Sequence, residues 1–262
     1  MSLPEDQDLS QFVTLVNIIA RLRAPGGCPW DRKQSHASLR ENLLEECYEV
    51  LAARDSADAP KLCAELGDLL MQIVFHAQIA TETGEFELGD VMWGINTKLI
   101  HRHPHIFGDK KVKDAEEVAL NWEELKREER AEGVSILDSV PEQMPALGYS
   151  QSIQRRVAQV GFDWENIEGV IDKVVEEVKE LNEAGTQEEK AREFGDLLFT
   201  LVNVARRLGI DAESALREAS ERFTRRFTDM EELCRQRGMN IGVLSLKELD
   251  ALWAEAKKMV GG

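Results

Sequence analysis

The sequence predicts an all-α protein made of two tandem repeated helical-bundle domains. Apolar residues recur at the 3.6-residue spacing of amphipathic helices over most of the chain. Strand signals are weak, and most of the 7 prolines and 18 glycines lie between the helically periodic segments. A set of acidic, basic and tryptophan positions also occurs twice in the same order. A length of 262 residues suits one large or two small domains, and 43% apolar residues are ample for a core.

The periodic segments define ten expected helices, five in each half of the chain. The first five cover residues 10–23, 38–54, 61–83, 88–101 and 115–131. The second five cover residues 148–159, 167–184, 188–208, 212–236 and 246–259. Capping-box patterns begin at Asp114 and Ser245, and Gly238 is a suitable stop for the long helix before it.

An acidic motif, EExxE followed by ExxD, occurs once in each half. The first copy consists of Glu45, Glu46, Glu49, Glu65 and Asp68. The second consists of Glu176, Glu177, Glu180, Glu193 and Asp196, at offsets of 131 (176 − 45) and 128 (193 − 65). Lys98 and Arg102 correspond to Arg222 and Arg226 at an offset of 124 (222 − 98), and Trp122 and Lys126 to Trp253 and Lys257 at 131 (253 − 122).

This order and near-constant spacing indicate an internal duplication. We expect an N-terminal domain over residues 1–132 and a C-terminal domain over 148–262. The segment 133–147, which contains Pro141 and Pro145, is the expected linker.

The paired carboxylates predict a metal site in each repeat. Residues three or four apart share a helix face, so Glu177 and Glu180 are neighbours, as are Glu193 and Asp196. Glu177 lies at the edge of an apolar stripe, where gathered carboxylates are costly unless a cation compensates them. Oxygen ligands favour a hard divalent ion such as Mg²⁺. An EExxE motif in a chain that is 31% charged can also be a solvated face, but its duplication favours a site.

Cations and aromatic residues on the later helices are candidate substrate contacts. Arg222 and Arg226 are four residues apart and could bind phosphate. Trp253 could equally pack in a core or lie near a base, with Lys257 on a phosphate. The three histidines between residues 101 and 105 favour a structural or substrate-loop role, because Pro104 interrupts the helix there.

Composition restricts the other classes of partner. A net charge of −17 argues against a general nucleic-acid or anionic-membrane surface. The four cysteines form no CxxC pair, which favours reduced thiols in a cytoplasmic protein. The N-terminus is polar and acidic, unlike a signal peptide, and Gln72, His76 and Gln78 interrupt the most apolar run.

Three further motifs complete a resemblance to a known family. They are Gly26–Asp31 (GGCPWD), Arg102–Asp109 (RHPHIFGD) and Gly161–Trp164 (GFDW). Together with the duplicated acidic motif they resemble the MazG nucleoside triphosphate pyrophosphohydrolases, of the all-α NTP pyrophosphatase group, over nearly the whole chain. The resemblance implies hydrolysis of (d)NTPs between the α and β phosphates to NMP and pyrophosphate. It also implies Mg²⁺, for which Mn²⁺ can substitute, and a homodimer.

Taken with the resemblance, the residues receive specific roles. Glu177, Glu180, Glu193 and Asp196 are the expected metal ligands, and Glu176 is a further ligand or the base for the attacking water. The expected substrate contacts are Lys173, Arg222, Arg226 and Lys257 on phosphates, Trp253 near the nucleoside and Asn203 on sugar or base. The expected second metal site is formed by Glu46, Glu49, Glu65 and Asp68.

The repeats differ where substrate is expected, which favours the C-terminal repeat as the main site. Lys173 corresponds to Asn42 (173 − 131), and Asn203 corresponds to Phe75 (203 − 128). Two alternatives stay open. One is a non-catalytic, dimeric nucleotide-sensing module. The other is an all-α pyrophosphatase with a narrower substrate, namely dUTP, dCTP or phosphoribosyl-ATP.

Overall fold

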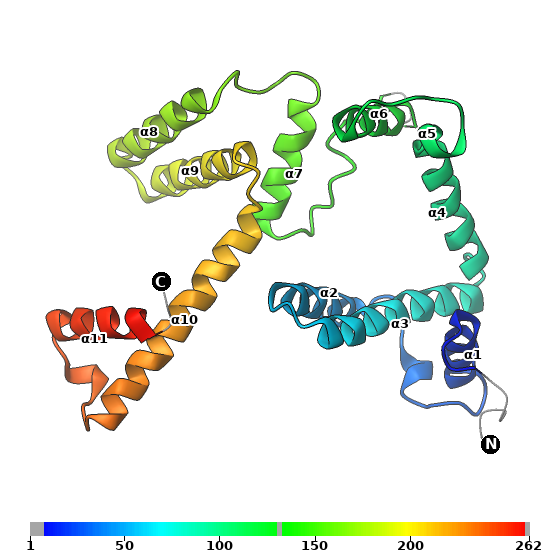
Figure 1. Cartoon of the computed structure of the whole chain (residues 1–262), viewed down its shortest axis with the longest axis horizontal. Coiled ribbons are helices and arrows are strands. Elements are labelled where there is room, and N and C mark those ends of the chain that lie inside the picture. Colours follow the sequence, from blue (N-terminus) through cyan, green and yellow to red (C-terminus); the bar gives the residue numbers. More distant parts are fainter. Residues whose placement is uncertain (1–7, 130–132, 260–262) are drawn as a thin grey trace. The chain divides into compact units, whose positions relative to one another are not determined.

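The fold is all-α, as predicted. A computed structural model of the chain describes residues 8–129 and 133–259, and every regular element among them is a helix (Figure 1). The chain divides into two units, Met1–Arg130 and Ala131–Gly262.

The first unit is organised around a helical hairpin. Its α-helices are α1 (Phe12–Arg23), α2 (Arg40–Asp55), α3 (Ala59–Thr83), α4 (Leu88–Arg102), α5 (Pro104–Phe107) and α6 (Ala115–Glu128), with a short 3₁₀ helix at Asp31–Lys33. Helices α2 and α3 form the hairpin, and α1 packs on α3. The buried core between them consists of Ile19, Leu39, Val74, Phe75 and Ile79.

The second unit repeats the hairpin and extends it with a long helix. Its α-helices are α7 (Ala146–Ala158), α8 (Ile167–Glu183), α9 (Gln187–Arg207), α10 (Ala212–Gln236) and α11 (Leu246–Met259), with a 3₁₀ helix at Ile241–Val243. Helices α8 and α9 form the hairpin, and α7 packs on α9 and on the start of α10. Helix α11 packs on the far half of α10 around Met230, Leu233, Cys234, Leu252 and Ala256 (Figure 1).

All ten predicted helices are present, with ends within three residues of the expected ones. Residues 130 and 131, the end of the predicted helix 115–131, lie outside the described residues. Helix α4 stops at Arg102, and the short α5 begins at Pro104, where a proline is tolerated in the first turn. Gly238 follows α10 with a φ of +64°, a left-handed conformation that favours glycine at a helix end.

The hairpin turns are fixed by side-chain caps, which hold the acidic faces together. Thr186 and Glu189 form a capping box at the start of α9, with the Glu189 backbone N–H donating to Thr186 Oγ1 over 3.1 Å. At the start of α3, Asp58 Oδ1 accepts a hydrogen bond from the Lys61 backbone N–H over 3.0 Å. Each cap begins the helix that carries the ExxD half of the acidic motif.

The predicted linker 133–147 is not wholly irregular. Helix α7 starts at Ala146, two residues inside it. Val140 is buried, and Arg156 Nη1 donates to Ser139 Oγ over 2.8 Å, so this segment packs within the second unit. The domain boundaries stay a prediction.

Helix α3 has the length and apolar composition of a membrane span. Its most apolar window has a mean hydropathy of 1.2, with 28% of that window buried in the structure. This is weak evidence, because core helices of soluble proteins meet the same criterion. The absence of a membrane partner stays a prediction.

Candidate metal and nucleotide site

The α8–α9 hairpin brings three predicted metal ligands together. One carboxylate oxygen each from Glu177, Glu180 and Glu193 lies within 4.8 Å of the other two. Glu177 is only 4% exposed, as its place at the edge of the apolar stripe predicts. The cluster forms because Glu177 and Glu180 are one helical turn apart on α8, opposite Glu193 on the antiparallel α9.

Lys173 supplies a positive charge at this cluster. Its Nζ lies 2.8 Å from Glu177 Oε1 and 2.9 Å from Glu176 Oε1. Hydrogen bonds to Glu177 and Glu176 hold the pKa of Lys173 above its usual value. Lys173 therefore stabilises the buried Glu177 carboxylate, and it holds Glu176 beside the cluster.

The α2–α3 hairpin contains an equivalent cluster without this lysine. Carboxylate oxygens of Glu46, Glu49 and Glu65 lie within 4.8 Å of one another. Burial, followed by the charges of Asp68 and Glu49, raises the pKa of Glu46. Desolvation and the neighbouring Glu49 raise the pKa of Glu65. Asn42 stands where the second repeat has Lys173, so no ammonium is supplied from that position.

The fourth predicted ligand of each set lies outside the three-residue cluster. Asp196 is exposed and lies one helical turn after Glu193 on α9. Asp68 has the same place after Glu65 on α3, and its charge acts on Glu46. Each aspartate thus shares the helix face of the glutamate three residues before it.

The donor set fits a hard divalent cation. All the grouped atoms are carboxylate oxygens, which Mg²⁺ and Mn²⁺ prefer. In the first repeat, burial first and neighbouring carboxylates second raise the pKa values of Glu46 and Glu65, and a bound cation would oppose both effects. In the second repeat, the Lys173 ammonium already occupies one side of the cluster as a cation.

The predicted phosphate and base contacts on α10 and α11 form a separate group. Trp253 packs against Phe223 with ring centroids 5.0 Å apart, beside the α10–α11 core. Arg222 pairs with Glu218 at 3.6 Å, and Lys257 is exposed. Arg226 Nε is buried and has no hydrogen-bond partner among the described residues. This group lies on α10 and α11, whereas the carboxylates lie on α8 and α9 (Figure 1), and among the described residues no hydrogen bond or ion pair joins the two groups.

Asn203 lies on α9 and is only 3% exposed. Its Oδ1 accepts hydrogen bonds from Arg206 Nε over 3.1 Å and from Arg206 Nη2 over 2.7 Å. Arg206 Nη2 also donates to Asp163 Oδ1 over 2.5 Å. Burial opposes ionisation of Asp163, but the hydrogen bond from Arg206 keeps its pKa below the usual value.

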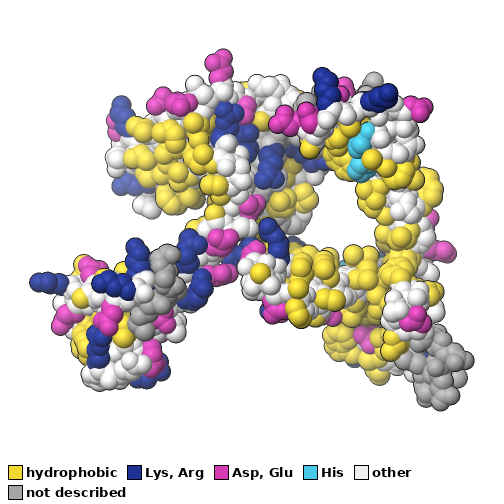
Figure 2. Space-filling model, viewed as in Figure 1, with side chains coloured by type: hydrophobic (Ala, Val, Ile, Leu, Met, Phe, Trp, Pro, Cys, Tyr) yellow, Lys and Arg dark blue, Asp and Glu magenta, His cyan; other side chains and the backbone are white. Residues whose placement is uncertain are grey.

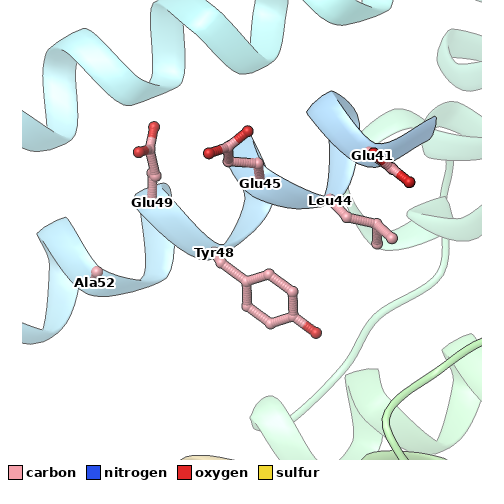
Figure 3. A pocket seen from close by; sticks show the side chains of 6 residues that line it. All are labelled: Glu41, Leu44, Glu45, Tyr48, Glu49 and Ala52. Carbon is pink, nitrogen blue, oxygen red and sulfur yellow. The ribbon is translucent and has the colours of Figure 1, made fainter. Parts of the chain in front are cut away.

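A hollow of about 600 Å³ lies along the exposed side of α2 (Figure 3). Its lining combines Glu41, Glu45 and Glu49 with Leu44, Tyr48 and Ala52. In Figure 3, Glu45 and Glu49 project from one side of α2, and Tyr48 projects from the other. The hollow is thus an open surface with an acidic edge and an apolar floor.

The sequence did not predict two contacts that histidine side chains make in the structure. His36 and His76 meet with their Nδ1 atoms 2.7 Å apart, although 40 residues separate them along the chain. His103 Nδ1 donates to the Leu99 backbone carbonyl oxygen over 2.6 Å, and its ring meets Trp122 edge-on. The contacts of His103 favour the structural role expected for the 101–105 histidines.

Fold and site together define a class of protein: an all-α enzyme with a duplicated carboxylate cluster on helical hairpins. A protein-family model, the MazG nucleotide pyrophosphohydrolase domain, matches residues 34–107 and 165–230. These two matches cover both hairpins and confirm the duplication. The chain therefore belongs to the MazG nucleotide pyrophosphohydrolase family, and it is a hydrolase of phosphoric anhydrides.

Three relatives match this chain over nearly its whole length, and two of them are matched over nearly their own whole length. A Thermotoga maritima protein, the nucleoside triphosphate pyrophosphohydrolase/pyrophosphatase MazG, is 46% identical over 94% of this chain and 95% of its own. A nucleoside triphosphate pyrophosphohydrolase of Escherichia coli is 43% identical over 95% of this chain and 98% of its own. An uncharacterised Bacillus subtilis protein, YabN, is 45% identical over 95% of this chain but only 52% of its own.

Proposed function

We propose that this protein hydrolyses nucleoside triphosphates between the α and β phosphates, giving NMP and pyrophosphate in a Mg²⁺-dependent reaction. Mn²⁺ is the expected substitute. The observation that carries the proposal is the cluster of Glu177, Glu180 and Glu193, whose oxygens lie within 4.8 Å of one another beside the Lys173 ammonium. The names of the T. maritima and E. coli relatives support the substrate class.

The chain's own residues have distinct tasks in this reaction. Glu177, Glu180 and Glu193, with Asp196, would hold Mg²⁺, which when bound neutralises phosphate charge and makes a coordinated water more acidic. Glu176 accepts a proton from the attacking water. The water oxygen bonds to the phosphorus on one side of the α–β bridge as the bridging P–O bond to that phosphorus breaks, and NMP and pyrophosphate are released. Lys173 exchanges part of its contact with Glu176 for a phosphate oxygen and stabilises the developing charge.

The main site is assigned to the second repeat. Lys173 provides a cation there, and Asn203 provides a polar group along the same hairpin. The first repeat has Asn42 and the apolar, buried Phe75 at these positions. The first repeat therefore keeps the groups that hold a metal but lacks two of the groups expected to bind a nucleotide.

A homodimer accounts for the uncovered apolar faces of both hairpins. Exposed apolar residues occur at equivalent places in the two repeats: Leu44 and Val175, Leu66 and Phe194, Leu70 and Leu198, Ile73 and Leu201. In Figure 2, apolar side chains are gathered on the visible face of the α2–α3 hairpin, and they are likewise gathered on the visible face of the α8–α9 hairpin. Contiguous apolar surface of this kind is typical of a protein–protein interface. Since both repeats carry it, the symmetric partner is a second copy of the chain.

The dimer also offers a way to complete the nucleotide site. Among the described residues, the α10–α11 group of Arg222, Arg226, Trp253 and Lys257 makes no hydrogen bond or ion pair with the α8–α9 carboxylates of its own chain. In the proposed dimer this group reaches the α8–α9 carboxylates of the partner and binds the phosphates there. Light scattering tests the dimer: Leu198→Glu should give a monomer with much reduced activity, whereas a monomeric wild-type chain would contradict the proposal.

Product analysis tests the reaction. The intact protein is incubated with ATP, dATP, dUTP and dCTP, with and without Mg²⁺, and products are identified by ³¹P NMR. NMP and pyrophosphate from several substrates support the proposal, and orthophosphate with NDP would contradict it. Turnover of dUTP or dCTP alone would favour the narrower pyrophosphatase. Tight nucleotide binding without turnover would favour the sensing module.

A cytoplasmic location, with no nucleic-acid or membrane partner, fits the acidic composition and remains part of the proposal. An electrophoretic-mobility assay with duplex and single-stranded DNA at low salt should show no shift.

A further inference from the structure

A row of polar residues runs along α9 from the carboxylate cluster to the end of the helix. It carries Glu193, Asp196, Thr200, Asn203 and Arg206, spaced three, four, three and three residues apart. Each residue of this row therefore shares a helix face with the next one in the row. Thr200 and Asn203 are buried, so the polar stripe continues into the packed part of the unit.

The first repeat has an apolar residue at only one of the five equivalent positions, the one that corresponds to Asn203, and it keeps Gln72 and Gln78 in place of Thr200 and Arg206. At an offset of 128 (203 − 75), Phe75 replaces Asn203, and it is 4% exposed in a core with Ile19 and Val74. An aromatic ring therefore fills the equivalent place in the hairpin of the first repeat. Because burying an amide costs free energy unless it is hydrogen-bonded, packing alone does not explain Asn203.

Arg206 fixes the orientation of the Asn203 amide. Two donors of Arg206 converge on Asn203 Oδ1, at 3.1 Å from Nε and 2.7 Å from Nη2. An arginine side chain has only donors, so the oxygen of Asn203 must face it. The Nδ2 group is then directed away from Arg206, and it presents two N–H donors.

Arg206 is itself held from another part of the chain. Its Nη2 donates to Asp163 Oδ1 over 2.5 Å, and Arg207 Nη1 donates to Asp163 Oδ2 over 3.2 Å. Arg206 is 12% exposed and Asp163 19% exposed, so both ends of this pair are largely shielded from water. The result is a fixed chain of contacts from the loop at Asp163 through Arg206 to Asn203.

We propose that Asn203 is a specificity residue that donates from Nδ2 to an acceptor on the sugar or base, and that Arg206, held by Asp163, is its positioning residue. The proposal rests on the proposed function and deepens it. Asn203 lies seven residues after Asp196, roughly 10 Å further along the helix. With the phosphates at the carboxylate cluster, this end of the stripe faces the nucleoside.

Steady-state kinetics with ATP, combined with product inhibition, tests the assignment. Asn203→Asp keeps an oxygen that accepts from Arg206 but replaces the Nδ2 donor by a second oxygen. Arg206→Lys removes the paired Nε and Nη2 donors that fix the Asn203 amide. Both variants should raise KM and the AMP inhibition constant about tenfold, the effect of one lost hydrogen bond that orients the ligand. The kcat value and the pyrophosphate inhibition constant should stay within about twofold, because the phosphate contacts are retained.

A matched control is available in the first unit. Arg23 is 6% exposed and makes a comparable pair with Glu82, with Nη2 2.7 Å from Oε2. Arg23→Lys disturbs an arginine–carboxylate pair whose arginine is also shielded from water. This pair lies in the first unit and includes no residue of α9. The variant should leave KM and both inhibition constants unchanged.

Two results would overturn the assignment. The first is that Arg206→Lys or Asn203→Asp leaves KM and the AMP inhibition constant at wild-type values. The second is that either variant weakens AMP and pyrophosphate binding equally, which would indicate a general structural disturbance of the site. Calorimetric titration of AMP gives a readout without turnover. A further outcome is that the wild-type protein releases no pyrophosphate while Asn203→Asp still binds AMP more weakly than wild type. That outcome would contradict the proposed reaction but support the proposed contact between Asn203 and the nucleoside.

Discussion

Lys173 is the residue that most clearly separates the two clusters. Its ammonium bridges Glu176 and Glu177 in the second repeat, at 2.9 and 2.8 Å. In the first repeat Asn42 takes this position, and the pKa of Glu46 is raised by burial and by Asp68 and Glu49. The two clusters thus differ by one compensating positive charge, which the second repeat has and the first lacks at this position.

Removing Lys173 should strengthen binding of the free metal and weaken binding of nucleotide. Lys173→Met deletes a competing cation, so calorimetry should show Mg²⁺ affinity increased about fivefold, while KM for ATP rises. These titrations are made with Glu46 and Glu49 changed to Gln, so that only the second cluster is observed. Asn42→Lys, titrated instead with Glu177 and Glu180 changed to Gln and the first cluster intact, is the reciprocal control, and it should weaken Mg²⁺ binding at the first cluster. Weaker Mg²⁺ binding by Lys173→Met would contradict this account.

Glu46 should make the stability of the fold depend on pH. Because its pKa is raised in the folded state, the native protein binds the proton more tightly than the unfolded chain does. Stability from this group is therefore fully present below the ordinary carboxyl pKa of 4.5, and it is lost as pH rises from that value through the higher pKa of the folded state. Glu46→Gln should raise the melting temperature by about 1–2 °C at pH 7 without Mg²⁺, and should have no such effect at pH 4.

Added Mg²⁺ should raise the wild-type melting temperature at pH 7 more than that of Glu46→Gln, because the variant has lost a ligand. Thermal melts followed by circular dichroism measure both effects. Equal Mg²⁺ shifts in the two proteins would contradict a metal site at Glu46.

At the scale of the element, the hairpin turns set the geometry of the site. The Thr186–Glu189 capping box starts α9 seven residues before Glu193 (193 − 186). Thr186→Ala should destabilise the protein by about 1 kcal/mol, the usual cost of losing a threonine cap. Urea unfolding measures the change, and Thr186→Ser should restore most of it. No loss of stability would show that tertiary packing alone fixes the turn.

Periodicity and spacing predicted the helices and the carboxylate clusters because both depend on short-range geometry. Glu177 and Glu180 share a face of any helix that contains them, and the capped hairpin turn brings Glu193 opposite. Contacts between distant residues were beyond such reasoning. Asp163 and Arg206 are 43 residues apart, and the pairing of His36 with His76 depends on how two segments pack. Trp253 and Lys257 matched the repeat pattern, yet their own chain places them on α11, apart from the carboxylates.

For the whole molecule, duplication has given two hairpins with similar carboxylate clusters and matched exposed apolar residues. Val175 and Leu44 are exposed at equivalent positions, as are Leu198 and Leu70. Repeated exposure at equivalent positions favours a symmetric assembly rather than isolated surface residues. The groups expected to bind phosphates lie on α10 and α11, so the proposed partner supplies them.

Mixing two inactive variants tests whether the site is completed by the partner. One protein carries Glu177→Gln and Glu180→Gln, and the other carries Arg222→Gln and Lys257→Gln, both exposed positions. If the cations act across the dimer, each mixed dimer contains one intact site, and random mixing should restore about a quarter of wild-type activity. If the cations act within one chain, the mixture stays inactive, which would contradict the shared site.

The central claim is that the carboxylates of the second repeat drive pyrophosphate release. The most direct test measures the rate of pyrophosphate release from ATP by two double variants of the full chain. Glu177→Gln with Glu180→Gln should lower the rate at least about 100-fold, since the metal-binding carboxylates are lost. Glu46→Gln with Glu49→Gln should keep it within about fourfold of wild type. The reverse pattern, or full activity in both variants, would contradict the account.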